Sequence, residues 1–258
     1  MTTPRFELSP TTRFADRAAD YALFRPSYPK EAIDAALQGL SLYDVALVVD
    51  AGAGTGIASR LFADRGLNVL AIEPNEEMRA SAGPHPRVSF RGGTAEATGC
   101  QSGSADIVVV AQAFYWFRPD AALAEFGRIL KPDGWLIFLV NERHHEDPAM
   151  RAYNAAIRAA AEHELSDGLR EAVEDALRGL GHHTPPAVVP CAQTLTHDGL
   201  IGRARSASYV PAEGPRYQRL LKDLDDLWRT HQDGQGLVTL RYRTFVWRVP
   251  AGRLIKAG

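Results

Sequence analysis

The chain has 258 residues, 23% of them charged, and a formal net charge of −2. This length suits one large domain, or one domain with a cap, that buries about 70–75% of the surface of its unfolded chain. The nearly neutral charge predicts neither nucleic-acid binding nor a basic membrane patch, and no apolar run reaches the roughly 18 residues of a membrane-spanning helix. Cys100 and Cys191 lie far apart, which argues against a disulfide framework and a thiolate metal site and favours a reducing cytosol.

The first 40 residues predict an irregular arm and two helices. Residues 1–12 are polar and contain proline, which suits a loose arm. A short helix is expected before Pro26, because the residue preceding a proline avoids the helical conformation. Residues 30–40 predict a second helix, since their apolar side chains recur on one face.

A glycine-rich turn between two apolar runs follows. The first run ends just before Gly52, Gly54 and Gly56, and the second ends at Glu73. Continuous apolar runs predict parallel strands buried on both faces, so this region reads as a strand–loop–helix–strand unit. The glycines let a ligand approach the backbone, and the N–H groups of the loop and of the next helix face that ligand. A carboxylate at position 73 can accept hydrogen bonds from both hydroxyls of a ribose.

The glycine spacing separates two cofactor classes. A dinucleotide fingerprint is G-x-G-x-x-G, whereas this chain has G-x-G-x-G followed by Ile57, with Asp50 just before the first glycine. The D-x-G-x-G-x-G pattern resembles motif I of the class I S-adenosylmethionine (SAM) methyltransferases, whose loop faces the methionine part of SAM. Binding of NAD or FAD, or a merely tight strand–helix turn, are the alternatives.

The rest of the chain predicts the other elements of an α/β domain. Strands are expected at 87–90, 105–110, 135–140, 185–196 and 237–249, with a turn at 130–134 and a bulge near Thr244, where the alternation of the last strand changes phase. Helices are expected at 75–82, 120–130, 197–205 and 215–231. Two more helices between 148 and 180, the second starting at Ser166, follow the fifth strand and form a natural cap over a substrate pocket.

Four further motifs resemble a small-molecule branch of the same methyltransferases, the trans-aconitate and ubiquinone type with a methyltransferase type 11 domain. They are Y-x-x-x-R-P-x-Y-P at 21–29, T-A-E at 94–96, A-Q-A-F-Y-W-F at 111–117 and L-K-P-D-G at 130–134. The resemblance implies an α/β fold with a Rossmann-like, doubly wound, seven-stranded sheet in the order 3-2-1-4-5-7-6, strand 7 antiparallel, and a helical cap insertion. It divides the chain into an N-terminal arm and cofactor-covering segment (1–40), a SAM-binding core (41–147), the cap insertion (148–184), and a C-terminal completion of the sheet with substrate-side helices (185–258).

The resemblance also implies a SAM site. Its candidate residues are Tyr21, Arg25, Asp50, Gly52, Ala53, Gly54, Gly56, Glu73, Pro74, Met78, Thr94, Ala95, Glu96 and Gln112. Arg25 can clamp the methionine carboxylate, with a surface role as the alternative. Met78 can lie against the adenine or simply pack its helix.

Candidate substrate-binding residues are Tyr28, Tyr115, Trp116, Asn141, Arg143 and Tyr209, and the candidate catalytic residues are Tyr115 and His144. Tyr115 stands where the branch often has histidine. A phenol with a pKa near 10 cannot act as a base at neutral pH, so Tyr115 is expected to orient the substrate or to present its ring to the sulfonium. Packing in a lid is the alternative for all four aromatic residues at 114–117.

Two other features of the sequence are weighed for ligand binding. His144 and His145 are adjacent, and neighbours in a strand point to opposite sides, so no metal site is predicted. Six arginines could suit an anionic substrate, although most are expected to form a solvated face: Arg203, Arg205, Arg216, Arg219, Arg241 and Arg243.

These observations together predict a cytoplasmic SAM-dependent methyltransferase, monomeric or homodimeric. It would move a methyl group from SAM to a small-molecule metabolite and release S-adenosylhomocysteine. One alternative keeps the fold but uses SAM in an intramolecular cyclisation or a rearrangement. Another is a non-catalytic SAM-binding partner protein.

Overall fold

A computed structural model describes residues 18–161, 168–207 and 209–254. The expected arm at 1–12 and the expected start of a helix at Ser166 lie outside the described residues. Among the described residues, no helix combines the length and the apolar character needed to cross a bilayer.

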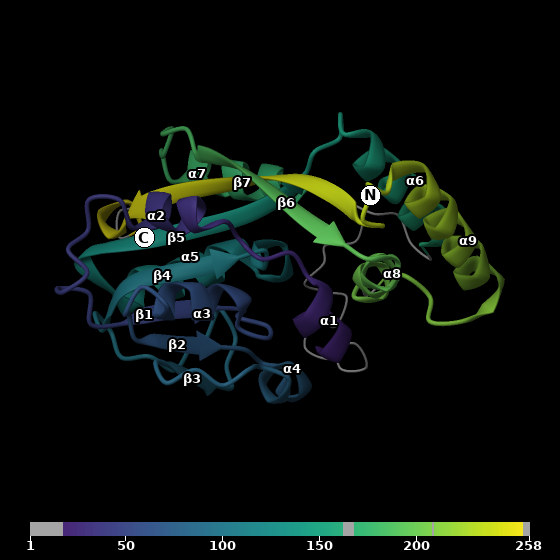
Figure 1. Ribbon diagram of the computed structural model, residues 1–258. Coiled ribbons are helices and arrows are strands. Elements are labelled where there is room, and N and C mark those ends of the chain that lie inside the picture. Colours follow the sequence, from purple (N-terminus) through teal and green to yellow (C-terminus); the bar gives the residue numbers. More distant parts are fainter. Residues whose placement is uncertain (1–17, 162–167, 208, 255–258) are drawn as a thin grey trace.

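Seven strands form one sheet at the centre of the molecule (Figure 1). They are β1 (Val48–Ala51), β2 (Val69–Ile72), β3 (Val88–Arg91), β4 (Ala105–Ala111), β5 (Leu130–Arg143), β6 (Ala187–Leu195) and β7 (Val238–Pro250). Their order is β3-β2-β1-β4-β5-β7-β6. Strands β1 to β5 pair in parallel, and β7 runs antiparallel to both β5 and β6. The predicted strand order and the antiparallel seventh strand are confirmed.

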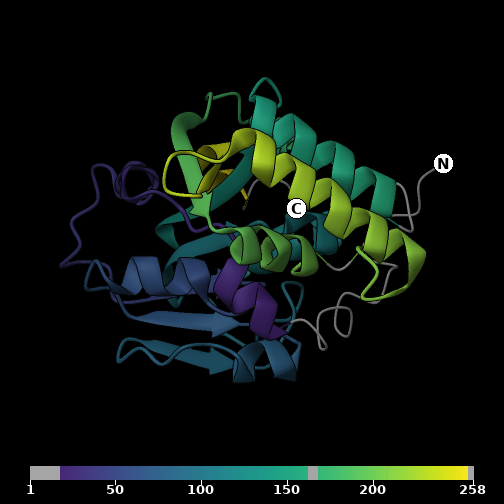
Figure 2. The same ribbon diagram turned by 45° about the vertical axis from the view of Figure 1, so that its right-hand side comes forward.

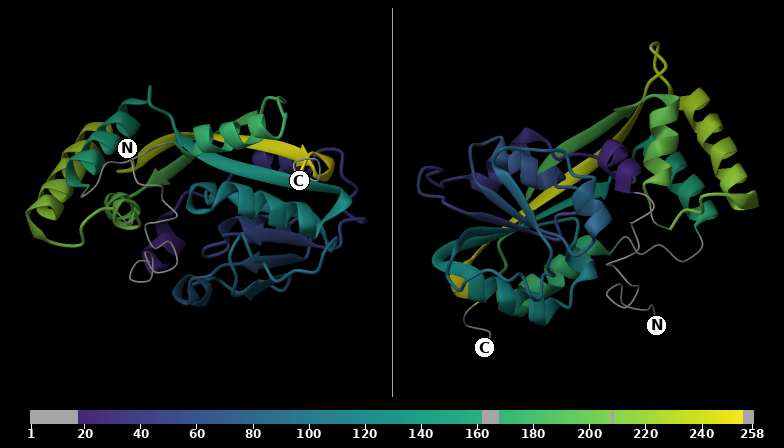
Figure 3. Two further views of the ribbon diagram at one scale, coloured as in Figure 1. Left: turned by 180° about the vertical axis from the view of Figure 1, so that it is seen from behind. Right: turned by 90° about the horizontal axis from the view of Figure 1, so that it is seen from below.

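Helices lie on both faces of this sheet and beyond the carboxyl ends of its parallel strands. They are α1 (Ala18–Phe24), α2 (Lys30–Leu37), α3 (Ile57–Ala63), α4 (Glu76–Ala80), α5 (Pro119–Ile129), α6 (Pro148–Ala160), α7 (Leu169–Gly179), α8 (His197–Arg205) and α9 (Gly214–His231), with short 3-10 helices η3 (Phe114–Trp116) and η4 (Ala251–Arg253). Helices α2 and α3 lie on one face, against β6–β7 and β1–β3. Helices α5 and α7 cover the other face, which the left panel of Figure 3 shows from behind. The helix predicted at 30–40 ends earlier, at Leu37.

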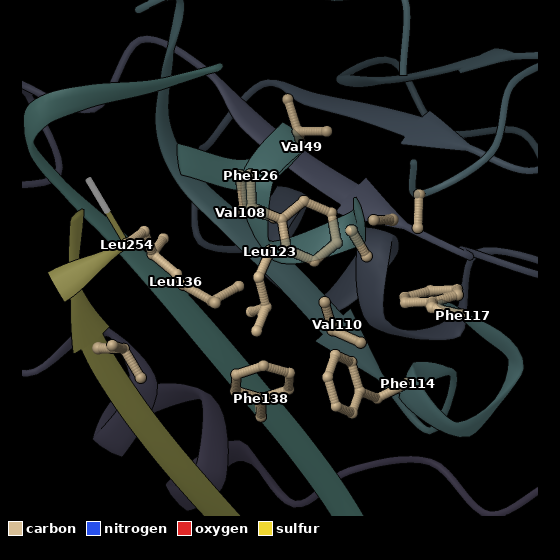
Figure 4. Close-up of a cluster of buried hydrophobic side chains, with 14 of the residues drawn as sticks. Val49, Val108, Val110, Phe114, Phe117, Leu123, Phe126, Leu136, Phe138 and Leu254 are labelled. Carbon is tan, nitrogen blue, oxygen red and sulfur yellow. The ribbon is translucent and has the colours of Figure 1, made fainter. Parts of the chain in front are cut away.

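The first hydrophobic cluster lies between the sheet and α5 (Figure 4). Phe126 on α5 packs over Val108 and Leu136, which come from β4 and β5. The rings of Phe114 and Phe138 meet edge to face, with centroids 5.1 Å apart. Because aromatic edges and faces carry opposite partial charge, this geometry adds to the stabilisation from burial and fixes η3 against β5. The cluster therefore holds the loop after β4 in place.

A second cluster joins α6, α8 and α9 beyond the carboxyl ends of the parallel strands. Helices α6 and α9 lie side by side (Figure 2), with the fully buried Tyr153 and Leu224 among their shared side chains. Helix α1 packs on α8 through Phe24 and Gly202. The two helices of the expected cap thus separate, since α6 joins this cluster whereas α7 packs on the sheet. The division of the chain into four segments stays a prediction.

Two details of the strands differ from expectation. The predicted turn at 130–134 lies inside β5, where the register with β4 passes from Ala105–Leu130 to Ile107–Trp135. Residues 131–134 therefore form an irregular bulge within the strand rather than a separate turn before it.

The bulge predicted near Thr244 is wrong. β7 pairs without a register shift with both β5 and β6 through this residue. Thr244 is fully buried, and Val246 continues the same alternation into the cluster under α2. Trp247 on the opposite face belongs to the cluster under α5 and α7. Because β7 is covered on both faces here, its apolar residues occupy both faces of the strand. The sequence therefore shows the loss of alternation that a bulge would also produce.

Candidate functional site

A cavity of about 250 Å³ opens at the carboxyl ends of the parallel strands. Its floor comes from the segments that follow β1, β2, β3 and β4 and from the end of β5. Helices α1 and α8 lie beside this edge of the sheet (Figure 1) and supply the opposite wall. Ligands of open α/β sheets bind in such crevices, where the strand order reverses on either side of β1 and β4.

The loop after β1 needs two of its glycines for different reasons. Gly52 has a φ of 69°, and a Cβ there would lie 2.8 Å from the Cβ of Ala113. Gly54 has a φ of 58°, a left-handed conformation that other residues rarely adopt. The nearest atoms to a Cβ at Gly54 would be the Met78 methyl at 3.3 Å and the Tyr21 ring at 3.8 Å. Gly54 thus lines the cavity beside Met78 and Tyr21.

Glu73 stands at the end of β2 and directs its carboxylate to the same loop. Its two oxygens accept hydrogen bonds from the backbone N–H groups of Gly54 and Asn75, both at 2.9 Å. The pKa of Glu73 is raised above its ordinary value, because the effect of burial exceeds the opposite effect of these two hydrogen bonds. Each carboxylate oxygen has a second lone pair, so each can accept one more hydrogen bond from a ligand in the cavity that Glu73 lines.

Asp50 lies beneath the loop and outside the cavity lining. The Ser59 hydroxyl donates a hydrogen bond of 2.5 Å to one carboxylate oxygen, and the other oxygen is buried without a partner among the described residues. Burial and, to a smaller extent, the charge of Glu73 raise the pKa of Asp50 to about 6, despite the Ser59 hydrogen bond. A positively charged ligand above the loop would stabilise the ionised form of this carboxylate.

Arg25 closes the cavity from the side of α1. Its guanidinium lies 4.7 Å from the centroid of the Tyr21 ring and donates a hydrogen bond of 2.9 Å to the Ser206 carbonyl. The hydrogen bond joins α1 to the end of α8, and both Arg25 and Tyr21 line the cavity.

Gln112 and Asn141 form the floor between β4 and β5. Gln112 has a φ of 56°, rare for a residue with a side chain. Its amide exchanges two hydrogen bonds with the backbone of Asn141, at 2.9 and 3.2 Å. The Asn141 amide in turn donates to the Ser27 carbonyl at 3.1 Å and accepts from the Thr244 hydroxyl at 2.6 Å. Asn141 thus ties the N-terminal segment to the sheet, which leaves its side chain little capacity for a ligand.

Arg143 at the end of β5 reaches the helices of the second cluster. It donates hydrogen bonds of 2.9 Å to the Asn154 amide oxygen and to the Tyr209 hydroxyl. Arg203 from α8 lies close by and is buried, with 3% of its surface exposed. Arg203 is therefore not among the arginines of a solvated face.

Most of the predicted site residues line one cavity. These are Tyr21, Arg25, Tyr28, Gly52, Ala53, Gly54, Glu73, Pro74, Met78, Thr94, Ala95, Glu96, Gln112, Tyr115, Trp116, Asn141, Arg143 and Tyr209. Asp50, Gly56 and His144 do not line it. Gly56 instead caps α3, where a Cβ would lie 2.7 Å from the Phe90 ring.

The cavity also contains residues that the sequence did not single out as its lining. His145, rather than His144, reaches it, and so do Glu142, Arg170, Arg203 and Tyr242. The position of Glu142 and His145 just after the fifth predicted strand was an available signal. Arg203 and Tyr242 come from elements that only the tertiary structure brings to this edge.

Comparisons with known proteins agree with this geometry. Residues 49–138 match a family model described as a methyltransferase domain. An uncharacterized methyltransferase of Mycobacterium tuberculosis is 38% identical over 147 residues, which cover 55% of this chain and 57% of that protein. The chain thus spans about half the length of the curated relatives it matches.

Two solved structures share the fold. One, from Anaeromyxobacter dehalogenans, is named as a type II methyltransferase whose activity is not established. It superposes with a TM-score of 0.59 at 23% identity, covering 87% of this chain and 96% of that one. The 4+2 cyclase SpnF superposes with a TM-score of 0.53 at 15% identity, covering 96% of this chain and 98% of the cyclase.

Proposed function

We propose that this chain, in which residues 49–138 match a family model described as a methyltransferase domain, transfers a methyl group from SAM to a small-molecule metabolite and releases S-adenosylhomocysteine. The observation that carries the proposal is Glu73, which lines the cavity and whose carboxylate accepts a hydrogen bond from the backbone N–H of Gly54. A buried carboxylate with remaining acceptor capacity, in a cavity that the glycine loop after β1 also lines, suits a ribose and the group attached to it. We also propose a cytosolic location, since both cysteines are free thiols.

We assign the parts of SAM to residues that line the cavity. Glu73 would bind the ribose, the segment at 94–96 would meet the adenine edge, and Met78 would pack beside the base. Tyr21 and Arg25 would bind the methionine carboxylate from the side of α1. The resemblance of these segments to methyltransferase motifs supports this assignment.

Methyl transfer asks mainly for alignment of donor and acceptor. The sulfonium of SAM is already an activated leaving group, and a well-oriented approach supplies on the order of 7–11 kcal/mol of the barrier. We propose that Tyr115 and Trp116, both in the lining, orient the acceptor or face the sulfonium with their rings. An acceptor that is already a carboxylate needs no general base, which agrees with tyrosine at position 115. For an acceptor that must lose a proton, His145 is better placed than His144, because His145 lines the cavity.

Mass spectrometry tests the proposal directly. The protein is incubated with SAM carrying a trideuterated methyl group and with a filtered small-molecule extract. We expect S-adenosylhomocysteine to accumulate together with one metabolite that gains the labelled methyl group, and Glu73→Ala to abolish most of both signals. Absence of both products from protein that binds SAM would contradict a methyltransferase function.

The same experiment distinguishes the alternative in which SAM is used without methyl transfer. Tyr115 in place of histidine motivates this alternative, and SpnF, named as a cyclase, has the same fold. Release of methylthioadenosine would indicate intramolecular cyclisation. A rearrangement catalyst or a non-catalytic partner protein would bind SAM and release neither product. The narrower resemblance to trans-aconitate and ubiquinone enzymes stays a prediction.

A further inference from the structure

We infer that Arg143 and Arg203 form a binding subsite for a carboxylate or phosphate group of the methyl acceptor. The inference rests on the proposed function, because it names a chemical class for the acceptor. It depends on three properties of this arginine subsite: the burial of Arg203, the lack of a carboxylate beside that residue among the described residues, and the distance of Arg143 from the predicted ribose position.

Arg203 is the central observation. Its side chain is almost fully buried and lines the cavity, and its Nε has no hydrogen-bond partner among the described residues. The hydrogen bond from its Nη1 to the Ser206 hydroxyl is long, at 3.4 Å. Within the described part of the chain, no Asp or Glu oxygen lies within 4.0 Å of this guanidinium. A buried cation without an anionic partner is unfavourable, so a ligand anion in the cavity would satisfy it.

Arg143 adds donors on the same side of the cavity. Arg143 donates to the neutral side chains of Asn154 and Tyr209. Guanidinium groups present planar pairs of N–H donors that match the oxygens of carboxylates and phosphates.

The glutamates of the cavity wall are engaged elsewhere. Glu142 pairs with Arg170 at 2.6 Å and with Arg243 at 3.0 Å. Glu96 accepts a hydrogen bond from the backbone N–H of Arg118, and the Glu73 carboxylate is held by the loop after β1.

The lowered pKa of Tyr209 agrees with a positive electrostatic potential at this end of the cavity. Burial alone raises the pKa of its phenol, but the nearby charges of Arg143, Arg25 and Arg203 outweigh that effect and lower the pKa. A positive field at this end of the cavity favours an anion there.

The subsite lies at the acceptor end of the cavity. Arg143 is at the end of β5, three strands away from β2, whose end carries Glu73. Neighbouring strands are about 4.8 Å apart, so β5 and β2 are separated by about 14 Å. A ligand that places its ribose at Glu73 leaves the β5 end to another molecule. An anionic acceptor there would also offset the repulsion between the arginines and the sulfonium cation.

Calorimetry on protein saturated with S-adenosylhomocysteine tests the inference. The probes are glutarate, its neutral counterpart glutaramide, and inorganic phosphate. We expect glutarate or phosphate to bind at least tenfold tighter than glutaramide. Arg203→Met and Arg143→Met should each weaken anion binding at least tenfold. Arg219→Met makes the same change in charge on α9, where the side chain is 76% exposed, and should leave anion binding unchanged.

Two further measurements separate the possible causes. Circular dichroism checks that each variant is folded, and Arg143→Met provides the test if Arg203→Met does not fold. Methylthioadenosine, which lacks the amino-acid part of the cofactor, is titrated alongside S-adenosylhomocysteine. If Arg203→Met weakens only S-adenosylhomocysteine, the arginine holds the carboxylate of the cofactor and the inference is overturned. It is also overturned if neither anion binds or if glutaramide binds equally well. Failure of the wild-type protein to bind S-adenosylhomocysteine would contradict the proposed function instead.

Discussion

Replacement of Glu73 by glutamine perturbs the proposed ribose contact with almost no change in shape. Each Glu73 oxygen already accepts one backbone N–H, from Gly54 or from Asn75. One remaining acceptor position on each oxygen is therefore available for one ribose hydroxyl. The substituted side chain would keep one oxygen and turn the other into an amide donor that faces a backbone N–H.

The magnitude follows from these contacts. The variant loses one ionic hydrogen bond to the ribose, worth roughly 1.5–3 kcal/mol, which corresponds to a Kd for S-adenosylhomocysteine that rises roughly 10- to 150-fold. One buried backbone N–H also loses its acceptor, so the free energy of unfolding should fall by about 1–3 kcal/mol.

Isothermal titration calorimetry at pH 8 measures the Kd. Methylthioadenosine keeps the ribose, so its affinity should fall by the same factor as that of S-adenosylhomocysteine. Glu77→Gln is the matched control, because it makes the same change in charge at an exposed position of α4 that does not line the cavity. A Kd within twofold of wild type in Glu73→Gln, or an equal loss in Glu77→Gln, would refute a ribose contact through Glu73.

Two further predictions concern the supports of the site. Because the pKa of Asp50 is raised to about 6 from an ordinary value near 4, the folded state holds this proton more tightly than the unfolded chain. The ionised carboxylate of Asp50 therefore destabilises the folded state, and this effect develops as the pH rises from about 4 to about 6. Relative to wild type, Asp50→Asn should gain about 2 kcal/mol in the free energy of unfolding between pH 4 and pH 7; parallel pH profiles from denaturant titrations would contradict this pKa. In Gly202→Ala, the new Cβ would lie 2.4 Å from the Phe24 ring, so α1 should shift and the Kd for S-adenosylhomocysteine should rise several-fold. Gly179→Ala places its Cβ in open space and should change neither affinity nor fold, and an unaltered Kd in Gly202→Ala would show that the position of α1 does not matter.

Much of the fold could be predicted because the apolar runs of the sequence are also the segments that the structure buries. The buried runs at β1 and β4, the glycine turn and the carboxylate at Glu73 all follow from residues close in sequence. The two errors in the strands concern the bulge predicted near Thr244 and the turn predicted at 130–134. Both arise where contacts between segments distant in sequence determine the local structure. Thr244 lies in a strand covered on both faces, so its neighbours are apolar for reasons that alternation along one strand does not reveal. The glycine and proline at 130–134 favour a turn, yet the pairing of Leu130 with Ala105 extends the strand around a bulge.

One side of the candidate site could be predicted from the sequence, and the other side could not. Its cofactor side is built from single β–loop–α units, and the predicted residues there lie together. Its acceptor side combines β5, β7, α8 and the segment after α8, which are far apart in sequence. The burial of Arg203, and the use of the Asn141 side chain to anchor the Ser27 carbonyl, depend on that combination and could not be predicted from local sequence.

The central claim, that the cavity is a SAM site, is tested most directly by titrating the wild-type protein with S-adenosylhomocysteine and, separately, with NAD. The glycine spacing, the glycine loop in the cavity lining and the position of Glu73 predict saturable one-to-one binding of S-adenosylhomocysteine and no saturable binding of NAD. Saturable binding of NAD without binding of S-adenosylhomocysteine, or binding of neither, would contradict the account.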